Sequence, residues 1–266
     1  LVASLLTSAF LLMGISSWRF ISRVDGPATW KVFYTGLVMA MVLAPLQALI
    51  GDMHGLNTLE HQPAKIAAME AIWNTEENVP FTLFAFPDET NRNNRLALEI
   101  PYAASLILTH SFSGEIQGLN EFEGNHPPVA PLFWCFRIMV GTGAVMIILS
   151  WWTGWRVFVR KSLPSLLQLR IFSLMTFSGW IAVLAGWYVN EIGRQPWLIY
   201  GEMTVQEGIA DHGGGMVLST LVIWLVLYAF ILYFYIITLR YLARKPSASL
   251  VGNVQNYPGL LPPKEA

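Results

Sequence analysis

The residues best able to do chemistry lie in segment 186–197, GWYVNEIGRQPW, where charged side chains follow an apolar run. Trp187, Glu191 and Arg194 are spaced at i, i+4 and i+7, which places them on one helical face. Pro196 has no N–H to continue the helical hydrogen bonds, so we expect the helix to end just before it. A carboxylate, a guanidinium and an indole that converge at a helix end could hold a flat, anionic, metal-bearing cofactor.

A second set of candidates lies in the apolar segment 129–155, where Arg137 and Met139 are two residues apart. A charge about 12 Å deep in a bilayer needs a partner. Arg137 either extends its side chain to the membrane surface or pairs with a buried anion such as a haem propionate. Met139 is either a packing residue or a metal ligand. Because residues two apart face nearly opposite sides of a helix, one cofactor could use both only if the arginine reached around it.

The third candidates, Lys65 and Glu70, lie in segment 61–76, HQPAKIAAMEAIWNTE, which we predict to be an amphipathic helix. Its apolar stripe consists of Ile66, Met69 and Trp73. The two charges are five residues apart, which is not the favourable spacing for a helical ion pair. They are either solvated charges on a surface helix or polar groups that hold the head of a lipid-soluble ligand bearing hydroxyls or carbonyls.

Composition indicates that these residues are positioned by membrane-spanning helices. Apolar residues make up 54% of the chain and charged residues 12%, against about 25% charged in soluble proteins. A helix needs about 20 apolar residues to cross a bilayer core. The stretches that reach or approach this length are 1–17, 32–51, 129–155, 171–190 and 213–239. We therefore predict an all-α, multi-span transmembrane helix bundle of about five spans, part of a larger bundle.

The distribution of Lys and Arg predicts the orientation, since positive charges concentrate in cytoplasmic connections. Connections 18–31 and 154–170 and the tail after residue 239 are rich in Lys and Arg. Connection 52–128 has 3 Lys or Arg against 11 Asp or Glu, and connection 191–212 has only Arg194. The last two are predicted to face outward.

Four regions follow from these assignments, and the second is too long to be a plain connection. They are two helices in 1–51, an outward loop in 52–128, three helices in 129–241 and a cytoplasmic, irregular tail in 242–266. Within the loop, the apolar run 100–110 is expected to rest on the membrane or cover a pocket. Leu1 reads as the middle of a helix with no basic leader, so we expect the chain to be the C-terminal piece of a longer protein.

The cysteine, the histidines and the net charge limit the kinds of site and ligand that the chain can have. The single cysteine, Cys135, lies in a predicted span, where we interpret it as a packing residue and expect no internal disulfide. A net charge of −1 gives no indication of nucleic-acid binding. No predicted span contains any of the histidines His54, His61, His110, His126 and His212. Bis-histidine haem ligation within the chain is therefore not expected. If haem is bound in the membrane, Met139 and Glu191 are the candidate ligands, and a histidine ligand would come from outside this sequence.

Three segments together resemble the C-terminal half of subunit I of cytochrome bd-type ubiquinol oxidases. They are GDMHGLNTLEHQPAKIAAMEAIW at 51–73, APLFWCFRIMVGTG at 130–143 and GWYVNEIGRQPW at 186–197. Their order, their spacing and the outward loop agree with that family over most of residues 1–241. The QPAKIAAMEA segment and the length of the loop resemble the cyanide-insensitive branch.

The resemblance implies ligand roles for residues in the last three spans. Met139 matches the axial ligand of a low-spin haem b, and Arg137 matches the arginine that stabilises this haem. Glu191 matches the carboxylate ligand of a high-spin haem b. Trp187 matches a tryptophan packed among the haems that assists electron passage. The same signature contains Arg194, which would pair with haem propionates, and Trp197.

The resemblance also implies a quinol site in the loop. Lys65 and Glu70 match quinol-binding residues, and Asp52 matches an acid at the loop entrance. The implied function is a terminal oxidase subunit of the bacterial inner membrane that oxidises ubiquinol, passes electrons through haems and reduces oxygen to water. This contributes to the proton motive force.

Further expectations concern parts that this sequence does not encode. The family has a third haem, either haem d or haem b, and its N-terminal helices supply histidine ligands. The implied partners are oxidase subunit II and a small single-span subunit.

Two other functions fit the embedded charges. One is a transporter-like bundle in which Arg137 and Glu191 line a polar pathway. The other is a structural membrane bundle that has lost activity.

Overall fold

The computed structural model describes residues 1–22, 26–209 and 213–244, in two separate units, Leu1–Glu207 and Gly208–Ala266. Within the described residues, five helices are long and apolar enough to cross a membrane. This confirms the predicted all-α, multi-span bundle. The predicted irregular tail lies outside the described residues from position 245 onward.

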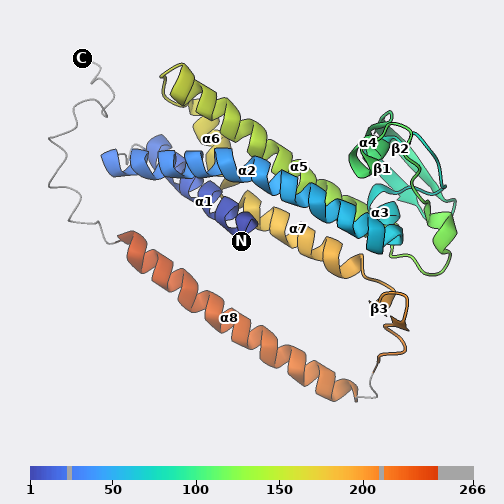
Figure 1. Cartoon of the computed structure of the whole chain (residues 1–266). Coiled ribbons are helices and arrows are strands. Elements are labelled where there is room, and N and C mark those ends of the chain that lie inside the picture. The colour runs from blue at the N-terminus through green and yellow to red at the C-terminus, as the bar shows by residue number, and fades with distance from the viewer. Residues whose placement is uncertain (23–25, 210–212, 245–266) are drawn as a thin grey trace. The chain divides into compact units, whose positions relative to one another are not determined.

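The long helices of the first unit alternate with the connections that the sequence predicted (Figure 1). They are α1 Val2–Ile21, α2 Pro27–His61, α5 Val129–Gly154, α6 Leu166–Leu174 and α7 Ser178–Ile192, with a 3₁₀ turn, Met175–Phe177, between the last two. The second unit contains α8, Gly214–Arg244. A π-helical turn, Trp155–Val159, follows α5. Each predicted apolar stretch therefore coincides, to within one residue at its start, with part of a longer helical segment.

Helix α2 shows why the predicted boundaries were short. It continues to His61, so Asp52, His54 and His61 lie on a helix rather than in a loop. Charged and polar residues end the apolar stretch but do not interrupt helical hydrogen bonds. The helix ends where Pro63 follows, because the residue before a proline is disfavoured in the helical conformation. Gln62 accordingly has φ −140° and ψ 63°.

The long loop is a folded unit, here called the outer module and defined as residues 63–128. It contains α3 Pro63–Glu70, β1 Phe81–Asp88, β2 Asn93–Ile100, α4 Ala103–Thr109 and a 3₁₀ turn, Leu119–Phe122. The predicted helix over 61–76 was too long, since Ala71 adopts the left-handed conformation and ends α3. The antiparallel β1–β2 hairpin, which pairs Phe81 with Ile100 and Asp88 with Asn93, was not predicted.

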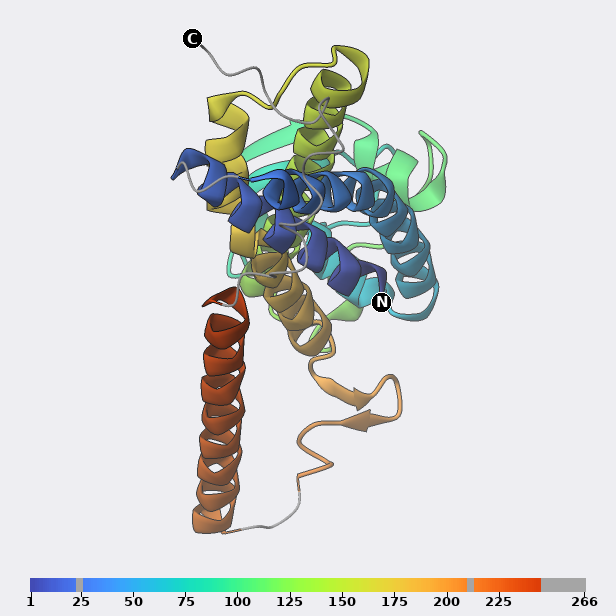
Figure 2. The ribbon, with the colours of Figure 1, turned by 90° about the vertical axis from the view of Figure 1, so that its left-hand side faces the viewer.

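The C-terminal end of α7 also differs from the prediction. The helix ends at Ile192 with Gly193 as its C-cap, so Arg194 follows the helix and does not share its face with Trp187. After a turn, β3 Trp197–Ile199 pairs with β4 Met203–Thr204 in a small hairpin (Figure 2).

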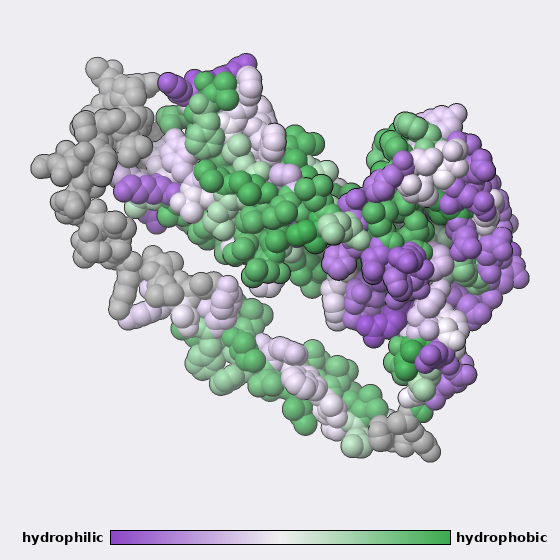
Figure 3. All heavy atoms as spheres, in the orientation of Figure 1, coloured by the Kyte–Doolittle hydropathy of each residue, from purple (hydrophilic) through white to green (hydrophobic). Residues whose placement is uncertain are grey.

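Two apolar cores hold the first unit together. One joins α1, α2, α5 and α6, with Phe10, Phe33 and Phe172 fully buried. The other joins the outer module to the N-terminal turns of α5 and includes Val189 of α7. Figure 3 shows apolar side chains over the helices and hydrophilic ones over the outer module, as expected for helices in lipid and a loop in water.

Candidate functional site

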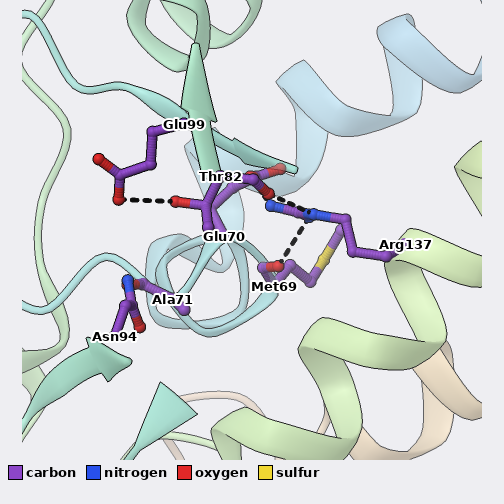
Figure 4. Close-up of polar contacts among 7 residues, drawn as sticks. All are labelled: Met69, Glu70, Ala71, Thr82, Asn94, Glu99 and Arg137. Atoms are coloured by element: carbon purple, nitrogen blue, oxygen red, sulfur yellow. Dashed lines mark hydrogen bonds and ion pairs between the residues drawn. The ribbon is translucent and has the colours of Figure 1, made fainter. Parts of the chain in front are cut away.

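A buried ion pair joins the outer module to the outer end of α5. The Arg137 Nη2 atom lies 2.7 Å from Glu70 Oε2, and the two side chains are only 8% and 6% exposed. Arg137 also donates from Nε to the Thr82 carbonyl at 2.7 Å and from Nη1 to the Met69 carbonyl at 3.2 Å (Figure 4). One side chain of α5 therefore contacts both α3 and β1.

Aromatic rings complete the surroundings of this guanidinium. Its central carbon lies 4.7 Å from the ring centre of Phe81 and 4.3 Å from that of Phe133, within range for a cation–π attraction. Three of the five N–H donors of Arg137 bind protein acceptors. The side chain is enclosed by the protein, with only 8% of it exposed. Its anionic partner in this structure is a carboxylate of the same chain.

Glu70 is not a solvated surface charge, which excludes the first interpretation of this residue. It is the last residue of α3 and is buried between that helix, β1 and α5. Burial raises the pKa of Glu70, and the neighbouring Arg137 opposes the rise. A buried carboxyl group with a raised pKa and a fixed cation beside it is suited to exchange protons.

Lys65 has a different environment, at the end of α7. A β-carbon on Gly193 would lie 2.6 Å from Lys65 Cε, so the lysine side chain packs directly against this glycine. Burial lowers the pKa of Lys65, the nearby Arg194 lowers it further, and Glu191 opposes the change. The fold therefore gathers Lys65, Glu191 and Arg194, while Glu70 faces Arg137.

Met139 faces away from the ion pair. A β-carbon on Gly186 of α7 would lie 2.9 Å from Met139 Sδ. Arg137 and Met139 thus face different neighbours, as their two-residue spacing predicts. Trp187, next to this glycine, is 55% exposed. Glu191 is half-buried near the end of the same helix and accepts a hydrogen bond from Asn190 Nδ2 at 3.3 Å.

Two predicted site residues lie apart from this arrangement. Asp52 is exposed on α2, well before the helix end, and not at the entrance of a loop. Trp197 is half-buried at the start of β3, and its ring lies 5.8 Å from that of Tyr200.

Three residues of the hairpin region were missed by the sequence analysis. The Thr82 carbonyl accepts from Arg137, Glu89 Oε1 accepts from Val129 N at 2.8 Å, and Asn94 binds the segment after α3. Polar residues between two runs rich in Phe and Leu, FTLFAF and RLALEI, were the available signal for a hairpin.

The donor atoms on α5 and α7 fit haem better than a bare metal ion. Among the described residues, no group of three or more His, Cys, Asp or Glu side chains could hold a metal. Haem iron requires only axial protein ligands. The Met139 thioether and the Glu191 carboxylate could each supply one. The absent side chain of Gly186 leaves the space that the Met139 sulfur needs.

The fold defines a class, a multi-span helical membrane protein with a folded module between two of its helices. Residues 1–247 match the family model described as cytochrome bd terminal oxidase subunit I, and the chain belongs to this family.

Relatives agree with this assignment. The chain is 29% identical over 249 residues to "Cytochrome bd ubiquinol oxidase subunit 1" of Bacillus subtilis (strain 168), covering 88% of this chain and 53% of the relative. It is 26% identical to "Cytochrome bd-II ubiquinol oxidase subunit 1" of Escherichia coli (strain K12), covering 74% and 52%. The solved structure of the bd oxidase from Geobacillus thermodenitrificans matches with a TM-score of 0.81 and 28% identity, over 92% of this chain and 56% of that one. The chain thus spans about half the length of the relatives it matches.

Proposed function

We propose that this chain acts within a membrane quinol:oxygen oxidoreductase, in which quinol is oxidised at the outer module and oxygen is reduced to water. The observation that carries the proposal is the Glu70–Arg137 ion pair. It joins a carboxylate of the outer module to Arg137 of α5, the helix that also bears Met139 two residues after this arginine. The proposed proton-exchanging group and the proposed haem ligand are thereby connected through one helix, α5.

The outer module would bind the quinol head group with its polar side chains. Glu70, whose pKa is raised by burial, is suited to accept a proton from a quinol hydroxyl. Lys65, whose pKa is lowered, can donate a hydrogen bond to a quinone oxygen at a smaller desolvation cost than an ordinary lysine. Asp52, exposed on α2, is proposed to act earlier, where quinol approaches. Protons released on this side would leave outward.

Residues of α5 and α7 would hold the haems. Met139 is the proposed axial ligand of low-spin haem b, and Glu191 that of high-spin haem b. Arg137 would stabilise the first haem with its positive charge. Haem, when bound, carries electrons one at a time.

The remaining roles are proposed for residues at the end of α7. Trp187 would pack among the haems, and Arg194 and Trp197 would hold the propionate side of the site. A third haem, d or b, completes the proposed set of cofactors.

The remaining expectations are also part of the proposal. Ubiquinol is the substrate, the cyanide-insensitive branch is the subfamily, and the bacterial inner membrane is the location. Oxidase subunit II and a small single-span subunit are the partners. The transporter-like alternative is less favoured, because Arg137 is enclosed by its own chain and does not line a pathway.

The test uses the full-length oxidase purified with its partners. Met139→Leu, nearly isosteric, is expected to remove the low-spin haem signal from the reduced-minus-oxidised spectrum while the protein still folds. Met53→Leu, at an exposed site on α2, is the control. An unchanged spectrum in Met139→Leu would contradict the ligand role.

The quinol role is tested in the same preparation. Glu70→Gln is expected to impair quinol oxidation far more than haem content, and Glu60→Gln, at an exposed site, should change neither. Loss of haem with normal turnover by the remaining enzyme would contradict the quinol site.

A further inference from the structure

Asn94, on β2, uses both ends of its side-chain amide to bind the segment that follows α3. Its Oδ1 accepts a hydrogen bond from Trp73 Nε1 at 2.9 Å, and its Nδ2 donates to the Ala71 carbonyl at 2.9 Å. Figure 4 shows this side chain next to Ala71, which directly follows Glu70. An amide suits this position because it presents an acceptor and a donor side by side.

The backbone that Asn94 binds turns sharply at Ala71. Ala71 has φ 54° and ψ 43°, a left-handed conformation that alanine adopts at an energetic cost. The last carbonyls of a helix and its cap lack helical partners. Asn94 supplies a partner for the Ala71 carbonyl and so stabilises the sharp turn at which α3 ends. Glu70 is the residue immediately before that turn.

The hairpin that carries Asn94 is itself fixed to α5. Glu89 Oε1 accepts from Val129 N at the start of α5, and the Phe84 ring lies 5.0 Å from that of Trp134. The Thr82 carbonyl accepts from Arg137. Two sets of contacts therefore hold Glu70 in position. Arg137 binds it directly, and Asn94 holds the turn beside it through a hairpin attached to the same helix.

We propose that Asn94 is a positioning residue for the quinol-site carboxylate Glu70. The inference rests on the proposed function, because it assumes that Glu70 binds quinol. Asn94 does not touch the substrate. It acts by holding the Ala71 turn, so that the Glu70 carboxylate stays aligned with both its arginine partner and the quinol head group.

The first experiment measures quinol oxidation by the full-length oxidase carrying Asn94→Ala, with haem content taken from the reduced-minus-oxidised spectrum. Loss of a hydrogen-bonded partner of this kind is expected to raise the KM for quinol about threefold to tenfold. The haem spectrum should stay unchanged. The control is Asn93→Ala, the exposed neighbour on the other face of the strand. An unchanged KM in Asn94→Ala would overturn the inference.

A second variant keeps the test informative if Asn94→Ala folds poorly. Trp73→Phe removes the indole N–H donated to Asn94 Oδ1, together with part of a buried ring, and should raise the KM in the same direction by a smaller factor. No change in the KM of Trp73→Phe, in protein with full haem content, would also overturn the inference.

A double-mutant comparison separates this inference from the proposed function. If Asn94 acts through Glu70, adding Asn94→Ala to Glu70→Gln should raise the KM no further. An undiminished effect in that background would show that Asn94 acts by another route and overturn the inference alone. If Glu70→Gln itself leaves quinol kinetics unchanged, the quinol-site assignment fails and this inference fails with it.

Discussion

At the scale of single residues, the most consequential contact is the buried Glu70–Arg137 pair. Removing two charges from water has a large desolvation cost, which is offset only when geometry and additional hydrogen bonds are good. Here the guanidinium has two backbone carbonyls and two aromatic rings besides the carboxylate. Either partner alone would be a buried, uncompensated charge.

We therefore expect Arg137→Met to destabilise the outer module by about 3–5 kcal/mol. The double variant Arg137→Met with Glu70→Leu should be less destabilised than Arg137→Met, since it leaves no unpaired charge. Chemical denaturation of the purified oxidase, compared across the two single variants and the double variant, measures this. A double variant as unstable as the sum of the single ones would contradict the coupling.

Lys65 leads to a prediction about pH. Burial and Arg194 lower its pKa, so the folded protein binds this proton less tightly than the unfolded chain, whose lysine pKa is about 10.4. The contribution of Lys65 to the free energy of unfolding is fully present above about pH 10.4. It is lost as the pH falls through the folded-state pKa of this lysine. Lys65→Met should therefore raise the unfolding midpoint near neutral pH, and its advantage should shrink at alkaline pH. Lys161→Met, at an exposed position, is the control. An advantage independent of pH would contradict this account.

At the scale of elements, glycines seven residues apart lie where α7 meets its neighbours, Gly179 and Gly186 within the helix and Gly193 at its C-cap. Gly186 leaves space for the Met139 sulfur of α5, and Gly193 leaves space for Lys65 of α3. Residues seven apart lie on nearly the same helical face. Helix α7 therefore sets the positions of a proposed haem ligand and a proposed quinol residue from one side.

Gly186→Ala should displace the Met139 side chain, because the added β-carbon would lie 2.9 Å from its sulfur. Overpacking of this kind costs about 1–3 kcal/mol. We expect a weakened or shifted low-spin haem band in the reduced-minus-oxidised spectrum. Gly143→Ala on α5, where a β-carbon meets nothing within 4 Å, is the matched control. Identical spectra for both variants would refute the role of Gly186.

At the scale of the whole chain, the helices and their connections imply one orientation in the membrane. The outer module and the turn after α7 meet at Lys65 and Gly193, so both belong to the same end of the helices. The Lys- and Arg-rich connections 18–31 and 154–170 follow the opposite helix ends. The positive-inside rule then places the outer module outside.

Cysteine labelling tests this orientation. In a Cys135→Ser background, a membrane-impermeant maleimide applied to spheroplasts should label Asn91→Cys, in the hairpin turn. It should label Lys161→Cys, between α5 and α6, only after lysis. The reverse pattern would invert the proposed topology and remove the outward release of protons.

Much of the architecture was predictable because it depends on local composition. A long apolar stretch forms a helix in lipid since every backbone polar group must bond internally. The five spans followed from this. Their ends did not, because helix α2 continues through Asp52 and His54 until Pro63 stops it. The hairpin was missed because its strands lack a strict alternation of apolar and polar residues.

The sequence by itself determined the number of spans, the candidate residues and the resemblance to a family, since these reside in composition and in short motifs. Only the tertiary structure decided which residues meet. Lys65 and Glu70 belong to one short helix, yet one faces Arg194 and the other is buried against Arg137. Residue spacing predicts which face of a helix a side chain occupies. The residues that contact this face come from distant parts of the chain. The partners of a charge therefore depend on packing that no local pattern encodes.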